Sequence, residues 1–144
     1  MIFLWRLKGS PVKSSYSDPT KQFNDMGDYA PSSAAYKAVA WAVATGITKG
    51  YADGGFHPTD SVTRKDTLIF LYRAAGKPRV SGTITFPDVL DLGLSQTSDT
   101  YRAILWGSSI GITNGYSDGN FQPMTNCLRE HIVTFLYRYH TKVK

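Results

Sequence analysis

One stretch of this chain occurs twice, and this repetition constrains the fold more than any other feature. Residues 36–73 and 101–138 align at a shift of 65, with 17 of 38 positions identical. A repeated unit buries its apolar face against its neighbours and presents the same surface more than once. The repetition therefore favours a binding module over an enzyme, because a catalytic site normally needs one asymmetric group of residues.

The first residues form a third, partial copy of the repeat. Residues 2–11 resemble residues 69–78 at a shift of 67, so we predict that residues 1–12 are the remnant helix of a preceding repeat. We also expect the chain to be a piece of a longer protein. Arg6 and Lys8 interrupt the apolar run at the N-terminus, which argues against a secretion signal peptide there.

Composition narrows the classes of protein that the chain can belong to. Of its 144 residues 42% are hydrophobic and 13% aromatic, as in a folded protein. A unit of about 60 residues is marginal by itself, so we expect the units to share a core. The net charge of +5 favours an anionic partner, but the basic residues form no runs, which argues against nucleic acid. No apolar run approaches the roughly 18 residues that span a bilayer, so no membrane insertion is expected.

Apolar periodicity and turn residues divide each full unit into helix, loop and helix, so the predicted fold class is mainly α. Gly46 is expected to end the first helix in the left-handed conformation. The expected repeats cover residues 23–78 and 86–140, and the expected helices within them cover residues 34–45, 63–75, 99–110 and 128–140.

The second helices of the two units differ from each other in their N-terminal caps. Thr63 and Asp66 have the spacing of a capping box, in which each side chain satisfies a backbone N–H group at the helix start. Leu128 occupies the equivalent of Thr63 in the second unit and cannot cap a helix in this way. Thr125 or Asn126 is the alternative cap.

Patterns for catalysis and metal binding are missing from the sequence. It has no zinc-ligand spacing, phosphate-binding loop or nucleophile elbow. His57, His131 and His140 occupy unrelated positions in the repeats, and Cys127 is expected to be a small buried side chain. We therefore predict a non-catalytic chain that needs no metal and no cofactor.

The repeated motif resembles that of a known family. A lead-in Phe-x-Asp-Val, a Tyr and a Trp on the first helix, the loop Gly-Ile-Thr-x-Gly-Tyr-x-Asp-Gly-x-Phe-x-Pro and Thr-Arg at the start of the second helix strongly resemble the S-layer homology (SLH) repeat. The resemblance spans residues 23–140 and the helix remnant before Gly9. The family's Ile-Thr-Arg-Ala-Glu motif is matched fairly by residues 62–66, whereas residues 127–131 keep only the arginine.

The resemblance implies a fold and a function. SLH modules usually occur in threes and fold into a pseudo-threefold helical bundle, so the third unit would be truncated here. They bind anionic secondary cell wall polysaccharides, often pyruvylated, and fix larger surface proteins to the walls of mostly Gram-positive bacteria. The implied chain is an extracellular, non-catalytic anchor at the cell wall or S-layer, with its ligand in grooves between repeats. The alternative is a helical repeat for protein–protein contact or surface-layer self-association.

Arg64 and Arg129 are the strongest candidates for ligand binding. Each is expected in the first turn of a helix, where free backbone N–H groups and the helix dipole already favour an anion. A cation at that position calls for a negative partner, and a carboxylate suits the guanidinium group. The alternative is a structural salt bridge to one of the nearby carboxylates, Asp25, Asp53, Asp88 or Asp118. Asp53 and Asp118 are otherwise expected to organise their own turns.

Other candidates come from the repeated aromatic and loop positions. Trp41 and Trp106 have two open interpretations, stacking on sugar rings or filling the core. Tyr51 and Tyr116 can offer a ring and a hydroxyl to a ligand. The remaining candidate ligand-binding residues are the neighbouring glycines of the loops and the acidic residues of the lead-in segments: Gly50, Gly115, Asp25 and Asp88.

Overall fold

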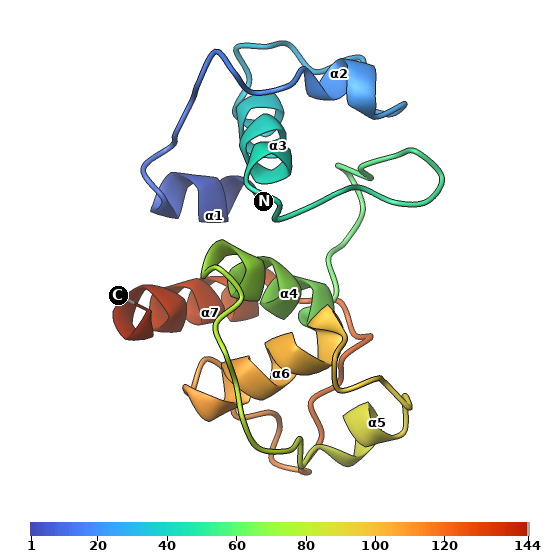
Figure 1. The fold of residues 1–144 in the computed structure, drawn as a ribbon, viewed down its shortest axis with the longest axis vertical. Coiled ribbons are helices and arrows are strands. Elements are labelled where there is room, and N and C mark those ends of the chain that lie inside the picture. The colour runs from blue at the N-terminus through green and yellow to red at the C-terminus, as the bar shows by residue number, and fades with distance from the viewer. Residues whose placement is uncertain (144) are drawn as a thin grey trace. The chain divides into compact units, whose positions relative to one another are not determined.

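The computed structural model describes residues 1–143, which contain seven helices and no β-strand (Figure 1). The mainly α fold predicted from the sequence is confirmed. The chain forms two compact units, one of residues Met1–Asp60 and one from Ser61 onward. The boundary between the units lies in the loop of the first full repeat, and each unit is described by itself.

The first unit contains α1 (Ile2–Leu7), α2 (Pro19–Gln22) and α3 (Ala34–Ala44). Helices α1 and α2 both pack against α3. On α1, Trp5 is buried, and its indole Nε1–H donates a hydrogen bond to the carbonyl of Pro11 at 2.9 Å. A small core cluster of Phe23, Met26 and Val39 lies where the lead-in segment meets α3.

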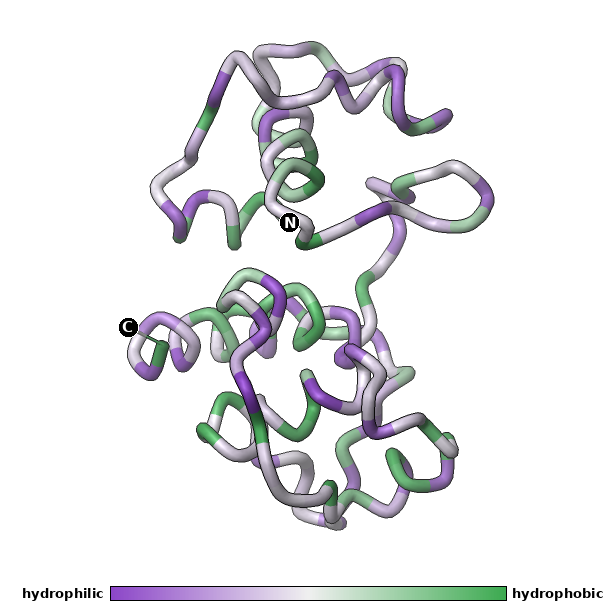
Figure 2. The backbone as a smooth tube through the Cα atoms, viewed as in Figure 1, coloured by the Kyte–Doolittle hydropathy of each residue, from purple (hydrophilic) through white to green (hydrophobic). Residues whose placement is uncertain are grey.

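The second unit contains α4 (Arg64–Ala74), α5 (Pro87–Leu90), α6 (Asp99–Ser109) and α7 (Arg129–Lys142). Helix α4 packs against both α6 and α7, and the apolar stretches of these helices appear green in Figure 2. The Trp106 ring lies 5.6 Å from the ring of Tyr72 and 6.4 Å from that of Tyr139. Gly107 lets Leu68 approach α6, because a Cβ atom at Gly107 would lie only 3.1 Å from the Leu68 side chain.

Helix packing in the second unit joins residues of the two full sequence repeats. Helix α4 ends the first full repeat and packs on α6, which begins the second. Helix α1 packs on α3 in the corresponding way. Each of these pairs buries apolar faces that neither amphipathic helix could bury alone.

The four long helices have the predicted positions, within two residues at each end. Gly46 has φ +72°, which confirms its left-handed cap, and the Thr63 hydroxyl accepts a hydrogen bond from the backbone N–H of Asp66, as expected. The short helices α2 and α5 were not predicted. Both begin with proline, and the Asp18 side chain caps α2 through the N–H of Thr20.

The predicted alternative caps of α7 are wrong. Leu128 precedes the helix, and no side chain caps it. The residues before it are engaged elsewhere, because Asn126 forms an isolated antiparallel bridge with Thr63 and the N–H of Cys127 donates to the Val62 carbonyl at 2.7 Å. This backbone pairing holds the segment before α7 in an extended conformation beside the start of α4.

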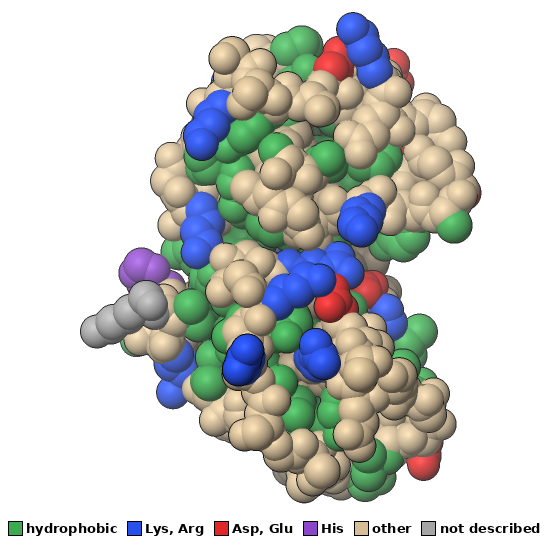
Figure 3. All heavy atoms as spheres, viewed as in Figure 1, with side chains coloured by type: hydrophobic (Ala, Val, Ile, Leu, Met, Phe, Trp, Pro, Cys, Tyr) green, Lys and Arg blue, Asp and Glu red, His purple; other side chains and the backbone are tan. Residues whose placement is uncertain are grey.

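Charged side chains are dispersed over the surface of the described residues. On the face shown in Figure 3, Lys and Arg side chains are scattered over both units, with acidic side chains near some of them. Within residues 1–143, no helix combines the length and the apolar character needed to cross a bilayer.

Candidate functional site

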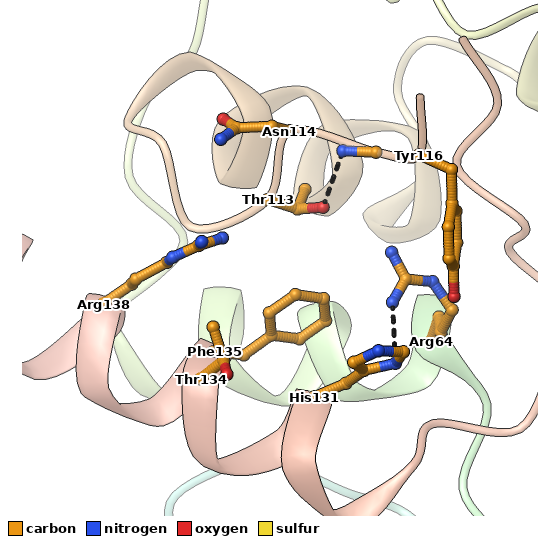
Figure 4. A pocket seen from close by; sticks show the side chains of 9 residues that line it. Arg64, Thr113, Asn114, Tyr116, His131, Thr134, Phe135 and Arg138 are labelled. Atoms are coloured by element: carbon orange, nitrogen blue, oxygen red, sulfur yellow. Dashed lines mark hydrogen bonds between the residues drawn. The ribbon is translucent and has the colours of Figure 1, made fainter. Parts of the chain in front are cut away.

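A pocket of about 290 Å³ lies in the second unit (Figure 4). Three segments build it: the start of α4, the loop that follows α6, and the inner face of α7. Its lining residues are Arg64, Thr113, Asn114, Gly115, Tyr116, His131, Thr134, Phe135 and Arg138. Two arginines and no carboxylate line the pocket, so its charge is positive.

Arg64 is the most deeply buried of the charged lining residues, with 4% of its surface exposed. Its Nε–H donates to the Phe121 carbonyl at 2.9 Å. The guanidinium carbon lies 4.6 Å from the ring centre of Tyr116, 4.9 Å from that of Phe121 and 5.2 Å from that of Phe135. These cation–π contacts offset part of the cost of burying the charge. Arg64, from the first full repeat, thus lies against the loop residues Tyr116 and Phe121 of the second.

The backbone at the start of α4 does not have the free N–H groups expected from the sequence. The N–H of Arg64 donates to the Thr125 carbonyl at 2.9 Å, and that of Lys65 donates to the Pro123 carbonyl at 3.0 Å. The loop of the second repeat thus satisfies the donors that the helix leaves open. An anion in the pocket would therefore bind the guanidinium group rather than the helix terminus.

Arg138 is a functional candidate that the sequence reasoning missed. Its position alone suggests no ligand, because a cation near the end of a helix is already stabilised by the dipole. In the structure it lines the pocket, half-buried, and one of its terminal nitrogens donates to the Ile112 carbonyl at 3.0 Å. The repetition of the Phe-Leu-Tyr-Arg block at both helix ends was the signal that could have identified it.

His131 lies on α7 and lines the pocket. Its Nδ1 lies 3.4 Å from a terminal nitrogen of Arg64, and its Nε2 lies 3.8 Å from a carboxylate oxygen of Glu130. Its ring also meets the ring of Tyr116 edge-on, with 6.2 Å between the ring centres. The sequence analysis placed His131 only among three histidines at unrelated positions of the repeats and gave it no role in ligand binding.

The loop that carries Tyr116 is fixed by contacts that occur in both repeats. The Thr113 hydroxyl accepts a hydrogen bond from the N–H of Gly115 at 3.2 Å. Gly115 has φ +72°, and a Cβ atom there would lie 2.6 Å from the Phe86 ring, so only glycine fits. In the first unit, a Cβ atom at Gly50 would clash with the Phe23 ring in the same way. The repeated Phe and Gly of the motif therefore form one packing contact.

The aspartates of the lead-in segments hold these loops. Asp88 accepts hydrogen bonds from the N–H groups of Phe121 at 3.0 Å and Gln122 at 2.7 Å. Asp25 accepts the equivalent bonds from Phe56 and His57, and these hold the pKa of its carboxyl below the ordinary value. Neither aspartate lines the pocket described above.

The aspartates within the loops organise their own turns, as expected. The Asp53 side chain accepts from the N–H of Gly55, and the Asp118 side chain accepts from that of Asn120, both at 2.9 Å. No carboxylate among the described residues forms an ion pair with Arg64. The structural salt bridge considered as the alternative role of Arg64 is therefore not found there.

The structure separates the other predicted site residues from this pocket. Trp41 and Trp106 are 5% and 4% exposed, so both fill the helix cores. Arg129 is exposed at the start of α7 and does not line the pocket. Gly50 and Tyr51 belong to the first unit, where Tyr51 is 56% exposed.

The loop of the first unit carries a charged cluster that has no counterpart in the second. His57 Nε2 lies 2.7 Å from Asp53, and its Nδ1 lies 2.9 Å from Asp60. Hydrogen bonds to Asp60 and Asp53 raise the pKa of His57 above its ordinary value. Within residues 1–143, no group of three or more His, Cys, Asp or Glu side chains is arranged to hold a metal ion.

Comparisons with known proteins agree with this repeated architecture. The model of the S-layer homology domain family matches residues 23–68 and 94–132. Cell surface glycoprotein 1 of Acetivibrio thermocellus is 31% identical over 96 residues, which cover 67% of this chain and 4% of that protein. The chain thus spans only a small part of the relative's length. No solved structure matches the chain.

The family match covers more than half of the chain, and it contains the lead-in aspartate of the first repeat, the glycine loops of both repeats and both helix-start arginines. SLH domains are non-catalytic modules that anchor proteins at the cell surface. The chain therefore belongs to the S-layer homology family.

Proposed function

We propose that the pocket of the second unit binds an anionic polysaccharide of the bacterial cell wall and so anchors the protein that carries it. One observation supports this most directly. Arg64 is 4% exposed, yet no carboxylate of the described chain pairs with it. A buried charge without a counterion is costly, and a negative ligand group would remove that cost.

A second arginine on α4 provides a contrast within the same unit. Arg73 lies 2.8 Å from the carboxylate of Asp99, which also pairs with Lys77. Burial alone would raise the pKa of Asp99, but the hydrogen bonds and charges of Lys77 and Arg73 hold it below its ordinary value. Asp99 of α6 thus neutralises Arg73, whereas Arg64 at the other end of α4 has no carboxylate partner among the described residues.

The pocket wall fits a saccharide as well as a negative charge. The rings of Tyr116 and Phe135 line it beside the guanidinium group, and Asn114 and Thr134 add polar groups. Aromatic faces favour the apolar C–H faces of sugar rings, and polar side chains favour their hydroxyls. A carboxylate ketal such as pyruvate is the expected anionic group, because a guanidinium group can contact both of its oxygens.

The direct test is cosedimentation with purified cell walls, before and after acid extraction of the secondary polymer. We expect the chain to sediment with intact walls and to stay in the supernatant with extracted walls. Undiminished binding to extracted walls would contradict a polysaccharide ligand.

Variants then assign the binding to the pocket. Arg64→Ala should weaken wall binding by roughly ten- to a hundredfold, the equivalent of about 1.5–3 kcal/mol for a charge-assisted contact. Arg64→Lys should recover part of it, since an ammonium group cannot make the two-pronged contact. The matched control is Arg102→Ala, which removes one exposed charge from α6 outside the pocket. Equal binding by wild type and a folded Arg64→Ala protein would refute the assignment.

We propose for the whole chain that residues 23–78 and 86–140 are SLH repeats of a pseudo-threefold bundle, and that residues 1–12 are the last helix of another repeat. The corresponding packing of α1 on α3 and of α4 on α6 supports this. Arg129, which lies outside the pocket, should contribute less to wall binding than Arg64.

The second candidate function is protein–protein contact or surface-layer self-association. The observation that favours it is the outer surface of α7 and the segment before it, where large apolar side chains are more than half exposed: Met124, Leu128, Val133 and Tyr137. Analytical ultracentrifugation of wild type and Tyr137→Ser separates the functions. Self-association that Tyr137→Ser abolishes while wall binding persists would support this second function in addition to the first.

A further inference from the structure

The second repeat carries a histidine where the first carries an acid. His131 corresponds to Asp66 at the repeat shift of 65. The Asp66 carboxylate accepts a hydrogen bond from the Thr63 hydroxyl at 2.7 Å and lies 2.8 Å from the ammonium group of Lys65. His131 instead faces the pocket, with its Nδ1 3.4 Å from Arg64 (Figure 4).

His131 presents a hydrogen-bond acceptor but no negative charge to Arg64. A guanidinium group can only donate, so Nδ1 of His131 accepts in this contact. A carboxylate in its place would lie within ion-pair distance of Arg64 and would cancel one of the two positive charges of the pocket.

Both arginines keep donors for a ligand. Arg64 uses its Nε–H on the Phe121 carbonyl and one terminal N–H on His131, and Arg138 uses one terminal N–H on the Ile112 carbonyl. Each guanidinium group has five N–H donors, so most of them are unused within the described chain. Figure 4 shows the two groups pointing into the pocket from opposite ends, with the Phe135 ring between them.

We propose that His131 is a specificity-determining residue that makes this pocket selective for saccharides with two negative charges over those with one. It does so by occupying, without a negative charge, the position at which a carboxylate would compensate Arg64. One negative group of the ligand then binds Arg64, and the other binds Arg138. This inference rests on the proposed function and adds the charge of the ligand to it.

The experiment compares two sugar acids of the same chain length as probes. Glucarate carries a carboxylate at each end, and gluconate carries one. Their dissociation constants are measured by NMR titration for the wild type, His131→Asp and His131→Asn. His131→Asp introduces the residue found at the equivalent position of the first repeat, and His131→Asn is the neutral control that can still accept a hydrogen bond from Arg64. Wall cosedimentation is measured in parallel.

We expect the wild type and His131→Asn to bind glucarate at least about tenfold more tightly than gluconate, since a second charge-assisted contact forms. His131→Asp should lose most of this preference while remaining folded by circular dichroism. Equal affinities of the wild type for both acids, binding of neither acid, or equal losses in the Asp and Asn variants would overturn the inference. In any of these cases, retained Arg64-dependent binding to cell walls would leave the proposed function standing.

Discussion

Asp88 connects the lead-in helix α5 to the loop that supports the pocket, so its removal should affect both stability and site. Its two oxygens accept the N–H groups of Phe121 and Gln122, and the Phe121 carbonyl in turn accepts the Nε–H of Arg64. Gln122 has φ +57°, which is unfavourable for a residue with a side chain. Without the Asp88 carboxylate, the N–H groups of Phe121 and Gln122 would lose their acceptor. The Phe121 carbonyl would then no longer be held in place to accept the Nε–H of Arg64.

The expected loss follows from the two hydrogen bonds. Each bond to a charged group contributes about 1.5–3 kcal/mol when it is well shielded. Asp88 is half-buried, and water can replace part of both bonds in the variant, so we expect Asp88→Ala to lower the free energy of unfolding by about 2–3 kcal/mol. Asp88→Asn keeps one oxygen acceptor without the charge and should cost about half as much.

The measurement must follow the second unit alone. Of the three tryptophans only Trp106 lies in that unit, so urea unfolding can be followed through its indole NMR signal. The control is Asp91→Ala, which removes an exposed carboxylate just after α5. A loss of less than about 0.5 kcal/mol in Asp88→Ala, the range of ordinary surface substitutions, would refute the reasoning.

Three further predictions concern other elements. Leu128→Thr should stabilise the second unit by about 1 kcal/mol in thermal unfolding, because Leu128 is 55% exposed and provides no cap to α7. Deletion of residues 1–10 should destabilise the first unit by several kcal/mol, seen in urea through the Trp41 indole signal, because α3 loses the buried side chains of α1. Asp60→Asn should lower the raised pKa of His57 in an NMR titration. Since folding raises the pKa of His57, protonation of its ring stabilises the folded unit below about pH 6.5. This stabilisation is lost as the pH rises through the pKa of His57 in the folded state.

The sequence predicted the elements that depend on local physics. Apolar periodicity located the four long helices, Gly46 ended one of them, and Thr63 capped another. The short helix α2 could also have been found, because Asp18 before Pro19 is a favourable cap followed by a favourable first residue.

The site was predicted only in part because it depends on contacts that are distant in sequence. The motif singled out Arg64 and Tyr116 as candidates, and the structure brings these two residues together. The motif could not show that Thr125 takes the backbone N–H of Arg64. Nor could it show that Arg138, at the far end of α7, turns into the same pocket. Such contacts follow from the packing of α7 on α4, which no local pattern encodes.

The packing of α4 on α6 has a consequence for how such modules can be divided or joined. The compact units are out of phase with the sequence repeats, since the boundary after Asp60 falls inside the family match of residues 23–68. A recombinant fragment cut at the linker of residues 79–85 would separate α4 from its packing partner. A cut between residues 60 and 61 would keep all four helices of the second unit together. Fusion partners and permuted termini therefore belong at the boundary after Asp60, inside a repeat rather than between repeats.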